Sequence, residues 1–293
     1  MFSDPASISL HNTQHIALNT YNIAFNTQHN SMTSINTICI CGVGTMGAGI
    51  AQSAAQAGFH TILYDVNKEM LAKAVSTISN SLQLLVGKTK ITTAEKDLAM
   101  SNLRFTADMN DCIADVFIEA IVENSAIKAG LFNRLNEFNH SEVIFATNTS
   151  SLSVSSIAAT VMNPQRVAGM HFFNPAPVMK LVEVVKADKT NDETIATIIS
   201  LAKQMGKTPV LCKDAPGFIV NHVARPYYLE ALRLMEAGVA DPETIDKLME
   251  ASGFKMGPFK LMDLIGNDVN YSVSVSVHEQ LGKPERLKPS FIQ

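Results

Sequence analysis

One histidine and one glutamate interrupt the apolar stretch "GMHFFNPAPVMKLVEV", residues 169–184. The proline-rich segment between them predicts a tight turn, which would make the flanking strands antiparallel and bring His171 beside Glu183. A histidine whose second ring nitrogen is held by a carboxylate has a fixed tautomer and a stabilised imidazolium form, and can act as a general base. Judged alone, such a histidine is more often a core residue, and Glu183 could be the exposed residue of an edge strand.

A glycine-rich segment predicts a dinucleotide site. In "NTICICGVGTMGAGIAQ" a G-x-G-x-x-G motif follows a short apolar strand and precedes a helical pattern. Its glycines permit a tight turn, close approach to a pyrophosphate, and close helix–strand packing, and the helix start offers free N–H groups to phosphate. Asp65 ends the next strand, where it can accept hydrogen bonds from the adenosine ribose, which favours NAD over NADP. The residues of the motif assigned to the cofactor are Gly42, Gly44, Thr45, Met46 and Gly47.

The elements that position these residues alternate between strands and helices. Strands are predicted at 38–41, 60–65, 115–120, 142–147, 166–174 and 180–187, with helices after the glycine motif, at 68–88, at 89–98 and around 127–135. This pattern predicts a doubly wound, mostly parallel Rossmann-type sheet, whose ligands bind at the carboxyl ends of the strands. From Phe218 onward the pattern is helical, with Asp241 as an N-cap. The predicted division is a polar flexible tail at 1–34, an α/β domain at 35–215 and an all-helical domain at 216–293.

Composition excludes several other classes of protein. Hydrophobic residues make up 46% of the chain and charged residues 17%, and the net charge is −4. These values give no electrostatic footprint for nucleic acid, and no apolar run approaches the roughly 20 residues of a membrane helix. The four cysteines form no C-x-x-C pair, so we expect buried thiols in a reducing cytoplasm and no metal site. The tail contains no lysine or arginine, which argues against a secretory signal or a mitochondrial presequence. A histidine-rich metal-binding tail is the alternative interpretation.

Several motifs in order resemble one enzyme family. "GVGTMGAGIAQ", "EAIVEN", "ATNTSSLS", "HFFNPAPVMKLVEVV" and "DAPGFIVN" are similar to the short-chain L-3-hydroxyacyl-CoA dehydrogenases, which include 3-hydroxybutyryl-CoA dehydrogenases. The similarity extends from about Ile35 to about Asp268. It implies a homodimeric oxidoreductase that transfers a hydride between the 3-hydroxyl carbon of an acyl-CoA and NAD, in fatty acid or butanoate metabolism.

The resemblance also implies roles for individual residues. His171 would be the base, oriented by Glu183, while Ser150 and Asn221 would contact the substrate; Ser150 would also contact the nicotinamide ribose. From the residues alone, Ser150 could instead cap a helix and Asn221 could be a polar point on a helix surface. The remaining implied contacts are Glu123, Lys128 and Asn174 for the cofactor, and Ser81 and Lys88 for coenzyme A.

Some features depart from the family pattern. His222 follows Asn221 where the family usually has arginine. The family's helical domain continues past the position of Gln293 into a lysine-containing, glycine-rich stretch, so we expect a short helical domain with part of its dimer contact missing or exposed. Two alternatives remain open: a related NAD-dependent dehydrogenase of a free hydroxy acid, and an inactive NAD-binding relative.

Overall fold

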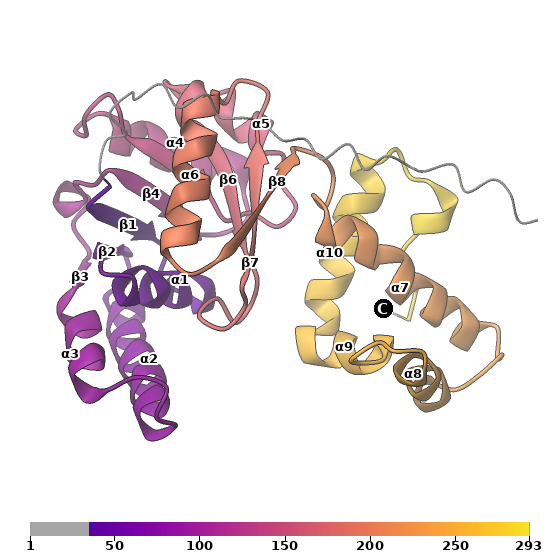
Figure 1. The fold of residues 1–293 in the computed structure, drawn as a ribbon. Helices are drawn as coiled ribbons and strands as arrows, with labels where there is room; N and C mark the ends of the chain where they lie inside the picture. Colours follow the sequence, from indigo (N-terminus) through magenta and orange to yellow (C-terminus); the bar gives the residue numbers. More distant parts are fainter. Residues whose placement is uncertain (1–34, 293) are drawn as a thin grey trace, which may run out of the picture. The chain divides into compact units, whose positions relative to one another are not determined.

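A computed structural model describes residues 35–292 of the chain (Figure 1). The predicted flexible tail at residues 1–34 lies outside the described residues. Among the described residues, none of the helices is long and apolar enough to cross a membrane.

Eight strands form one sheet in the order β3-β2-β1-β4-β5-β6-β7-β8. All neighbouring strands are parallel except β6 and β7, which are antiparallel. The predicted mostly parallel, doubly wound sheet is therefore confirmed. The strands are β1 (Thr37–Cys41), β2 (His60–Tyr64), β3 (Leu103–Thr106), β4 (Val116–Glu119), β5 (Ile144–Thr147), β6 (Val167–Phe172), β7 (Leu181–Lys186) and β8 (Thr208–Lys213).

Helices cover both faces of this sheet because its central strands are apolar on both sides. Ile50 of α1, Ile78 of α2 and Ile198 of α6 belong to the core on one face, and Figure 1 shows α6 lying across the strands. Phe132 of α4 and Ile157 of α5 belong to the core on the other face. The helices are α1 (Thr45–Gln56), α2 (Lys68–Gly87), α3 (Thr93–Ser101), α4 (Ser125–Asn136), α5 (Val154–Ala158) and α6 (Asp192–Gln204).

Helix α3 begins four residues later than the predicted start at Thr89. Thr92 accepts a hydrogen bond from the backbone of Glu95, and Glu95 in turn accepts one from the backbone of Thr92, which is a capping box. Thr89 has a φ of 52°, in the left-handed region, and cannot be helical. The prediction for residues 89–92 was wrong because a strong local cap competes with a continued helix.

A third core lies among the helices that follow β8. Tyr228, Leu229, Leu232 and Met262 form it, separate from the two cores of the sheet. The predicted N-cap at Asp241 is confirmed, since its side chain accepts from the backbone N–H of Thr244. These helices are α7 (Val220–Glu236), α8 (Pro242–Ala251), α9 (Pro258–Ile265) and α10 (Asn267–Gln280).

Candidate active site

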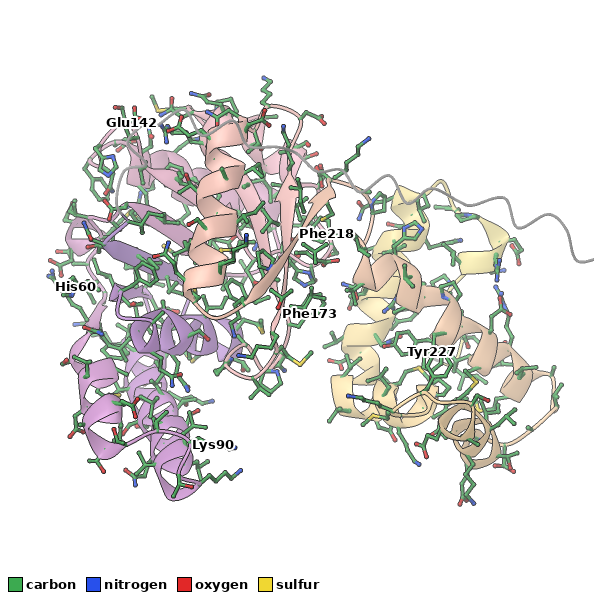
Figure 2. All side chains as sticks on the ribbon, in the orientation of Figure 1. His60, Lys90, Glu142, Phe173, Phe218 and Tyr227 are labelled. Atoms are coloured by element: carbon green, nitrogen blue, oxygen red, sulfur yellow. The ribbon has the colours of Figure 1, made fainter. Side chains whose placement is uncertain are left out.

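His171 and Glu183 are directly opposite each other on β6 and β7. The His171 Nδ1 atom lies 2.7 Å from Glu183 Oε2, and the two residues are only 6% and 1% exposed. The predicted antiparallel pairing is therefore confirmed. Among residues 35–292 nothing hydrogen-bonds to Nε2 of His171, so this nitrogen is available to another group. The rings of Phe173 and Phe218 lie 4.6 and 5.7 Å from the imidazole, and both residues are labelled in Figure 2.

Glu183 uses its second carboxylate oxygen to hold the start of α7. Oε1 accepts hydrogen bonds from the backbone N–H groups of Ile219 and Val220, each at 2.9 Å. Burial acts to raise the pKa of Glu183, but the bonds from His171 and from these two N–H groups outweigh it and lower the pKa. The carboxylate is therefore stabilised as an anion between a histidine and a helix N-terminus.

The connection between β8 and α7 is attached to the sheet at a second point. Asp214 accepts hydrogen bonds from the Ser153 hydroxyl at 2.8 Å and from the Ser155 backbone N–H at 2.7 Å. Between Asp214 and α7, Gly217 and Phe218 have φ values of 72° and 49° and form a sharp bend. This bend buries the Phe218 ring, which is 6% exposed, next to His171.

Ser150 and Asn221 are brought together near this pair. Ser150 follows β5, and its backbone carbonyl accepts a hydrogen bond from Asn221 Nδ2 at 3.3 Å. The turn that contains Ser150 is held to β6 by Asn148, whose Oδ1 accepts from the Phe172 N–H at 2.8 Å. Asn221 is the second residue of α7. The side chains predicted to contact substrate are therefore placed by the end of β5 and by the start of α7.

Glu123 and Lys128 support the Ser150 turn from the neighbouring loop. Glu123 Oε1 accepts a hydrogen bond from the Thr149 hydroxyl and another from the Ser150 N–H at 3.2 Å. Lys128 lies 3.1 Å from Glu123 and 2.6 Å from Glu119. Lys128 is only 1% exposed, so its ammonium group is buried beneath the loop that carries Glu123.

Glu119 is a site residue that we did not predict from the sequence. It is fully buried at the end of β4 and also accepts from the Thr147 hydroxyl at 2.8 Å and the Ile121 N–H at 2.7 Å. Burial raises its pKa, while Lys128 and these hydrogen bonds oppose the rise. The sequence did contain a signal for Glu119. In "DVFIEA" an acidic residue ends an apolar strand, just as Glu183 is an acidic residue within the apolar strand "LVEVV".

The glycine motif has the backbone geometry of a dinucleotide turn. Gly42 has a φ of 89°, and a Cβ atom on it would lie 2.7 Å from the Ala120 carbonyl oxygen. A Cβ atom on Gly47 would lie 1.8 Å from the Gly42 carbonyl oxygen, whereas one on Gly44 would meet no atom within 4 Å. Gly44 is the N-cap residue of α1 and has no side chain that could accept hydrogen bonds from the first N–H groups of the helix. These N–H groups can therefore bind an anion.

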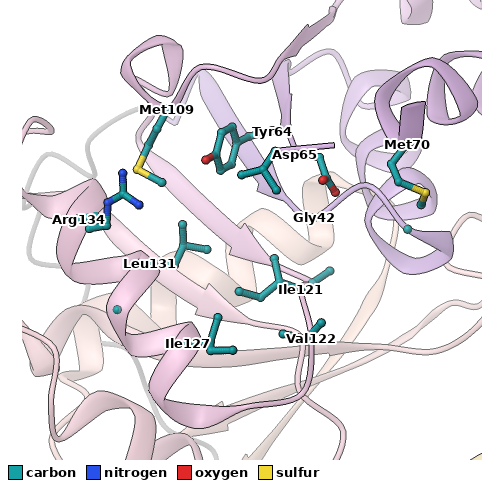
Figure 3. A pocket seen from close by; sticks show the side chains of 14 residues that line it. Gly42, Tyr64, Asp65, Met70, Met109, Ile121, Val122, Ile127, Leu131 and Arg134 are labelled. Carbon is teal, nitrogen blue, oxygen red and sulfur yellow. The ribbon is translucent and has the colours of Figure 1, made fainter. Parts of the chain in front are cut away.

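A pocket of about 600 Å³ opens beside this turn (Figure 3). Met109 and Arg134 lie at one end of the pocket and Met70 at the other. Asp65 lines it at the end of β2, with one oxygen 3.1 Å from the Val43 N–H and the other 2.9 Å from the Asn67 N–H. A carboxylate oxygen has two lone pairs, so Asp65 can still accept ribose hydroxyls. The residues lining the pocket are Gly42, Gly44, Tyr64, Asp65, Val66, Met70, Met109, Ala120, Ile121, Val122, Ile127, Gly130, Leu131 and Arg134.

Replacing Gly47 with alanine is expected to abolish measurable NADH binding and to destabilise the fold by about 2–4 kcal/mol. The added methyl group would collide with the Gly42 carbonyl, which is backbone and cannot rotate away. Fluorescence titration with NADH and urea unfolding measure the two effects. The control is Gly87→Ala at the end of α2, where an added Cβ meets nothing within 4 Å. Unchanged NADH affinity in Gly47→Ala would contradict this role.

The remaining predicted residues do not join this group through any described contact. Ser81 is half-buried on α2, and Lys88 is exposed at the end of that helix. Asn174 is exposed in the β6–β7 turn, where its peptide bond to Pro175 is cis. His222 is exposed and lies 3.1 Å from the Pro216 carbonyl through Nδ1. Thr45 and Met46 occupy the first turn of α1, next to Gly44.

Two family models match successive parts of the chain. Residues 37–215 match the model of the 3-hydroxyacyl-CoA dehydrogenase NAD binding domain, and residues 217–293 match that of the 3-hydroxyacyl-CoA dehydrogenase C-terminal domain. A 3-hydroxyadipyl-CoA dehydrogenase of Escherichia coli is 45% identical over 89% of this chain and 56% of its own length. A probable 3-hydroxybutyryl-CoA dehydrogenase of Bacillus subtilis is 42% identical over 85% of this chain and 87% of its own length.

A solved structure has the same fold. The (S)-3-hydroxybutyryl-CoA dehydrogenase of Ralstonia eutropha superimposes with a TM-score of 0.85 at 36% identity, over 88% of this chain and 92% of its own. The present chain thus spans nearly all of this relative but about half of the Escherichia coli one. The predicted NAD-binding Rossmann domain and the predicted resemblance to this family are confirmed by these matches. The chain belongs to the 3-hydroxyacyl-CoA dehydrogenase family.

Proposed function

We propose that this protein interconverts an L-3-hydroxyacyl-CoA and the corresponding 3-oxoacyl-CoA, using NAD. The observation that carries the proposal is the buried His171–Glu183 pair, which lies at the edge of a Rossmann-type sheet where ligands bind. Glu183 orients the imidazole through Nδ1 and leaves Nε2 available. A nitrogen in this position is suited to accept a proton from an alcohol or to return one.

In the oxidative direction, His171 Nε2 accepts the proton of the 3-hydroxyl group. Nδ1 keeps its hydrogen bond to Glu183, which stabilises the imidazolium as it forms. NAD, when bound, supplies the hydride acceptor for C3. In the reductive direction His171 returns the same proton to the oxygen of the 3-oxo group.

Ser150 and Asn221 orient the substrate oxygen beside His171 in this proposal. Two hydrogen bonds support this role. Asn221 Nδ2 donates to the Ser150 carbonyl, and the Phe172 N–H at the end of β6 donates to Asn148 in the turn that contains Ser150. Glu123 and Lys128 act on the cofactor side by fixing the Ser150 turn, because the Lys128 amine already faces Glu119 and Glu123.

The cofactor site is assigned to the glycine motif and the pocket beside it. Gly42, Gly44 and Gly47 form the pyrophosphate turn with Thr45 and Met46, and Asp65 receives the adenosine ribose. The open space around Gly44 and the uncapped N-terminus of α1 fit a pyrophosphate. Asn174 in the β6–β7 turn is assigned to the nicotinamide end, and Ser81 and Lys88 to coenzyme A.

The names of the relatives include adipyl, butyryl and unspecified acyl groups. The residues proposed to act at C3 of the substrate do not distinguish between these acyl groups. The direct test is oxidation of NADH by the purified protein with acetoacetyl-CoA. We expect turnover with NADH and at least about 100-fold lower kcat/KM with NADPH, whose 2′-phosphate Asp65 repels. Turnover of free acetoacetate at an equal rate would favour a dehydrogenase of free hydroxy acids. NADH binding without turnover of either compound would favour an inactive NAD-binding relative.

We also infer a division into an NAD-binding domain at 35–215 and a helical domain at 216–293, which forms a homodimer. The separate core around Leu229 and Met262 supports the division. Exposed apolar side chains on the helices, including Leu248 at 65% and Leu264 at 70%, support a subunit contact. A sedimentation mass of one chain would contradict the dimer. The four free cysteines suit a reducing compartment, and we place the protein in the cytoplasm.

A further inference from the structure

Two carboxylates and one amine form a charge cluster at the carboxyl end of β4. Its members are Glu119, Glu123 and Lys128, and Lys128 Nζ lies 2.6 Å from Glu119 and 3.1 Å from Glu123. The other polar partners of the two glutamates are N–H and hydroxyl groups that donate to them. Carboxyl groups that only accept hydrogen bonds are stabilised in the ionised form. The charge cluster therefore holds two negative charges and one positive charge.

The charge cluster has one negative charge in excess. Within residues 35–292, Lys128 is the only basic side chain that lies within 4.0 Å of either carboxylate. Glu119 is fully buried and Lys128 is 1% exposed, whereas the Glu123 side chain is 39% exposed. Buried charges are screened by solvent ions much less than surface charges, so the excess charge acts on groups bound nearby.

The charge cluster lies between the two ends of the assigned cofactor site. In the sheet, β4 and β5 separate β1, which precedes the glycine turn, from β6, which carries His171. The hydride acceptor must reach the substrate beside His171, so the cofactor has to cross the ends of β4 and β5. On this path Ile121 lines the cofactor pocket (Figure 3), and its N–H donates to Glu119 at 2.7 Å. Further along, the Ser150 N–H donates to Glu123.

We propose that the charge cluster sets the preference of the protein between the oxidised and reduced forms of its cofactor. The nicotinamide ring carries a positive charge in NAD⁺ and none in NADH, while the rest of the molecule is the same. Excess negative charge near the ring strengthens the binding of NAD⁺ relative to NADH. This inference rests on the proposed function, because it uses the assigned cofactor site. Glu119 is a positioning residue for Lys128 and acts on the cofactor through its charge.

The experiment measures the ratio of two dissociation constants, Kd for NAD⁺ divided by Kd for NADH. NADH is titrated by its fluorescence, and NAD⁺ by competition against NADH. Glu119→Gln removes the excess negative charge at nearly constant size and is expected to raise the ratio about 3- to 30-fold. Lys128→Met adds to the excess and should lower the ratio. A purely structural role would weaken the binding of both forms together and would not move the ratio.

Two further variants cover the effects of the substitution on folding and on shape. Glu123→Gln removes a negative charge from a more exposed position, so it tests the inference even if Glu119→Gln fails to fold, and it should also raise the ratio. Glu119→Asp keeps the charge and should keep the ratio. The matched control is Glu142→Gln, because Glu142 is a partly exposed acid that pairs with Arg166 and precedes β5, at the opposite end of that strand. It should leave the ratio unchanged.

The outcomes separate this inference from the proposed function. An unchanged ratio in both Glu119→Gln and Glu123→Gln, or in Glu123→Gln alone if the buried variant does not fold, would overturn the inference. The proposed function would then stand, as long as the wild-type protein binds NADH and reduces acetoacetyl-CoA. Absence of NADH binding to the wild-type protein would overturn the proposed function itself.

Discussion

Replacing His171 with glutamine is expected to lower kcat for reduction of acetoacetyl-CoA by about 10²–10⁴-fold, with NADH affinity nearly unchanged. Glutamine can occupy the space beside Glu183 but cannot carry a proton to the substrate oxygen. The cofactor pocket is formed by residues around Gly42 and Asp65, away from β6 and β7 in the sheet order, so NADH binding should persist.

Steady-state kinetics and an NADH titration of the same preparation separate the two effects. His222→Gln is the control, because His222 is an exposed histidine whose ring hydrogen-bonds only to the Pro216 carbonyl among the described residues. Normal turnover in His171→Gln would show that another group moves the proton.

Replacing Glu183 with glutamine is expected to affect both catalysis and stability. The carboxylate holds His171 with one oxygen and the backbone N–H groups of Ile219 and Val220 with the other. A glutamine that keeps its oxygen on the N–H groups turns its NH₂ toward Nδ1. The ring must then carry its proton on Nε2, which can no longer accept one. We expect kcat to fall by about 10²-fold or more, and the free energy of unfolding to fall by about 2–4 kcal/mol.

The pH dependence of unfolding gives a second readout for Glu183. Its pKa in the folded protein is lowered, so the carboxylate contributes stability above its unfolded pKa, and this contribution is lost as the pH falls through the folded pKa. Urea unfolding between about pH 3 and pH 7 should therefore show a smaller loss of stability on acidification in Glu183→Gln than in the wild-type protein. Glu193→Gln, at an exposed position on α6, is the control. An identical acid dependence in wild type and Glu183→Gln would contradict the assignment.

The predicted parts of the site are those set by local patterns. The glycine turn depends on residues adjacent in the chain, and the pairing of His171 with Glu183 follows from a short turn that fixes strand register. The contacts that hold the Ser150 turn could not be predicted from the sequence. They consist of the hydrogen bond from the Ser150 N–H to Glu123 and the ion pairs of Lys128 with Glu119 and Glu123, and these residues lie on separate elements. Strand β8 was missed because its sequence "TPVLCK" contains a proline and exposed apolar residues, as an edge strand permits. Helix α10 was missed because its serines and asparagines weaken the helical pattern.

The buried pair of Glu119 and Lys128 restricts how this part of the sequence can evolve. Loss of Lys128 alone leaves the buried Glu119 carboxylate without a cation, at a cost of about 3–5 kcal/mol, which is a large share of the stability of most domains. Loss of Glu119 alone leaves the buried Lys128 with only the more exposed Glu123 as its partner. Replacement of both by apolar residues is far less costly, but a lineage reaches that state only through an unstable single substitution. We therefore expect relatives either to keep both residues or to replace both, although neither is assigned a direct contact with the reacting carbon.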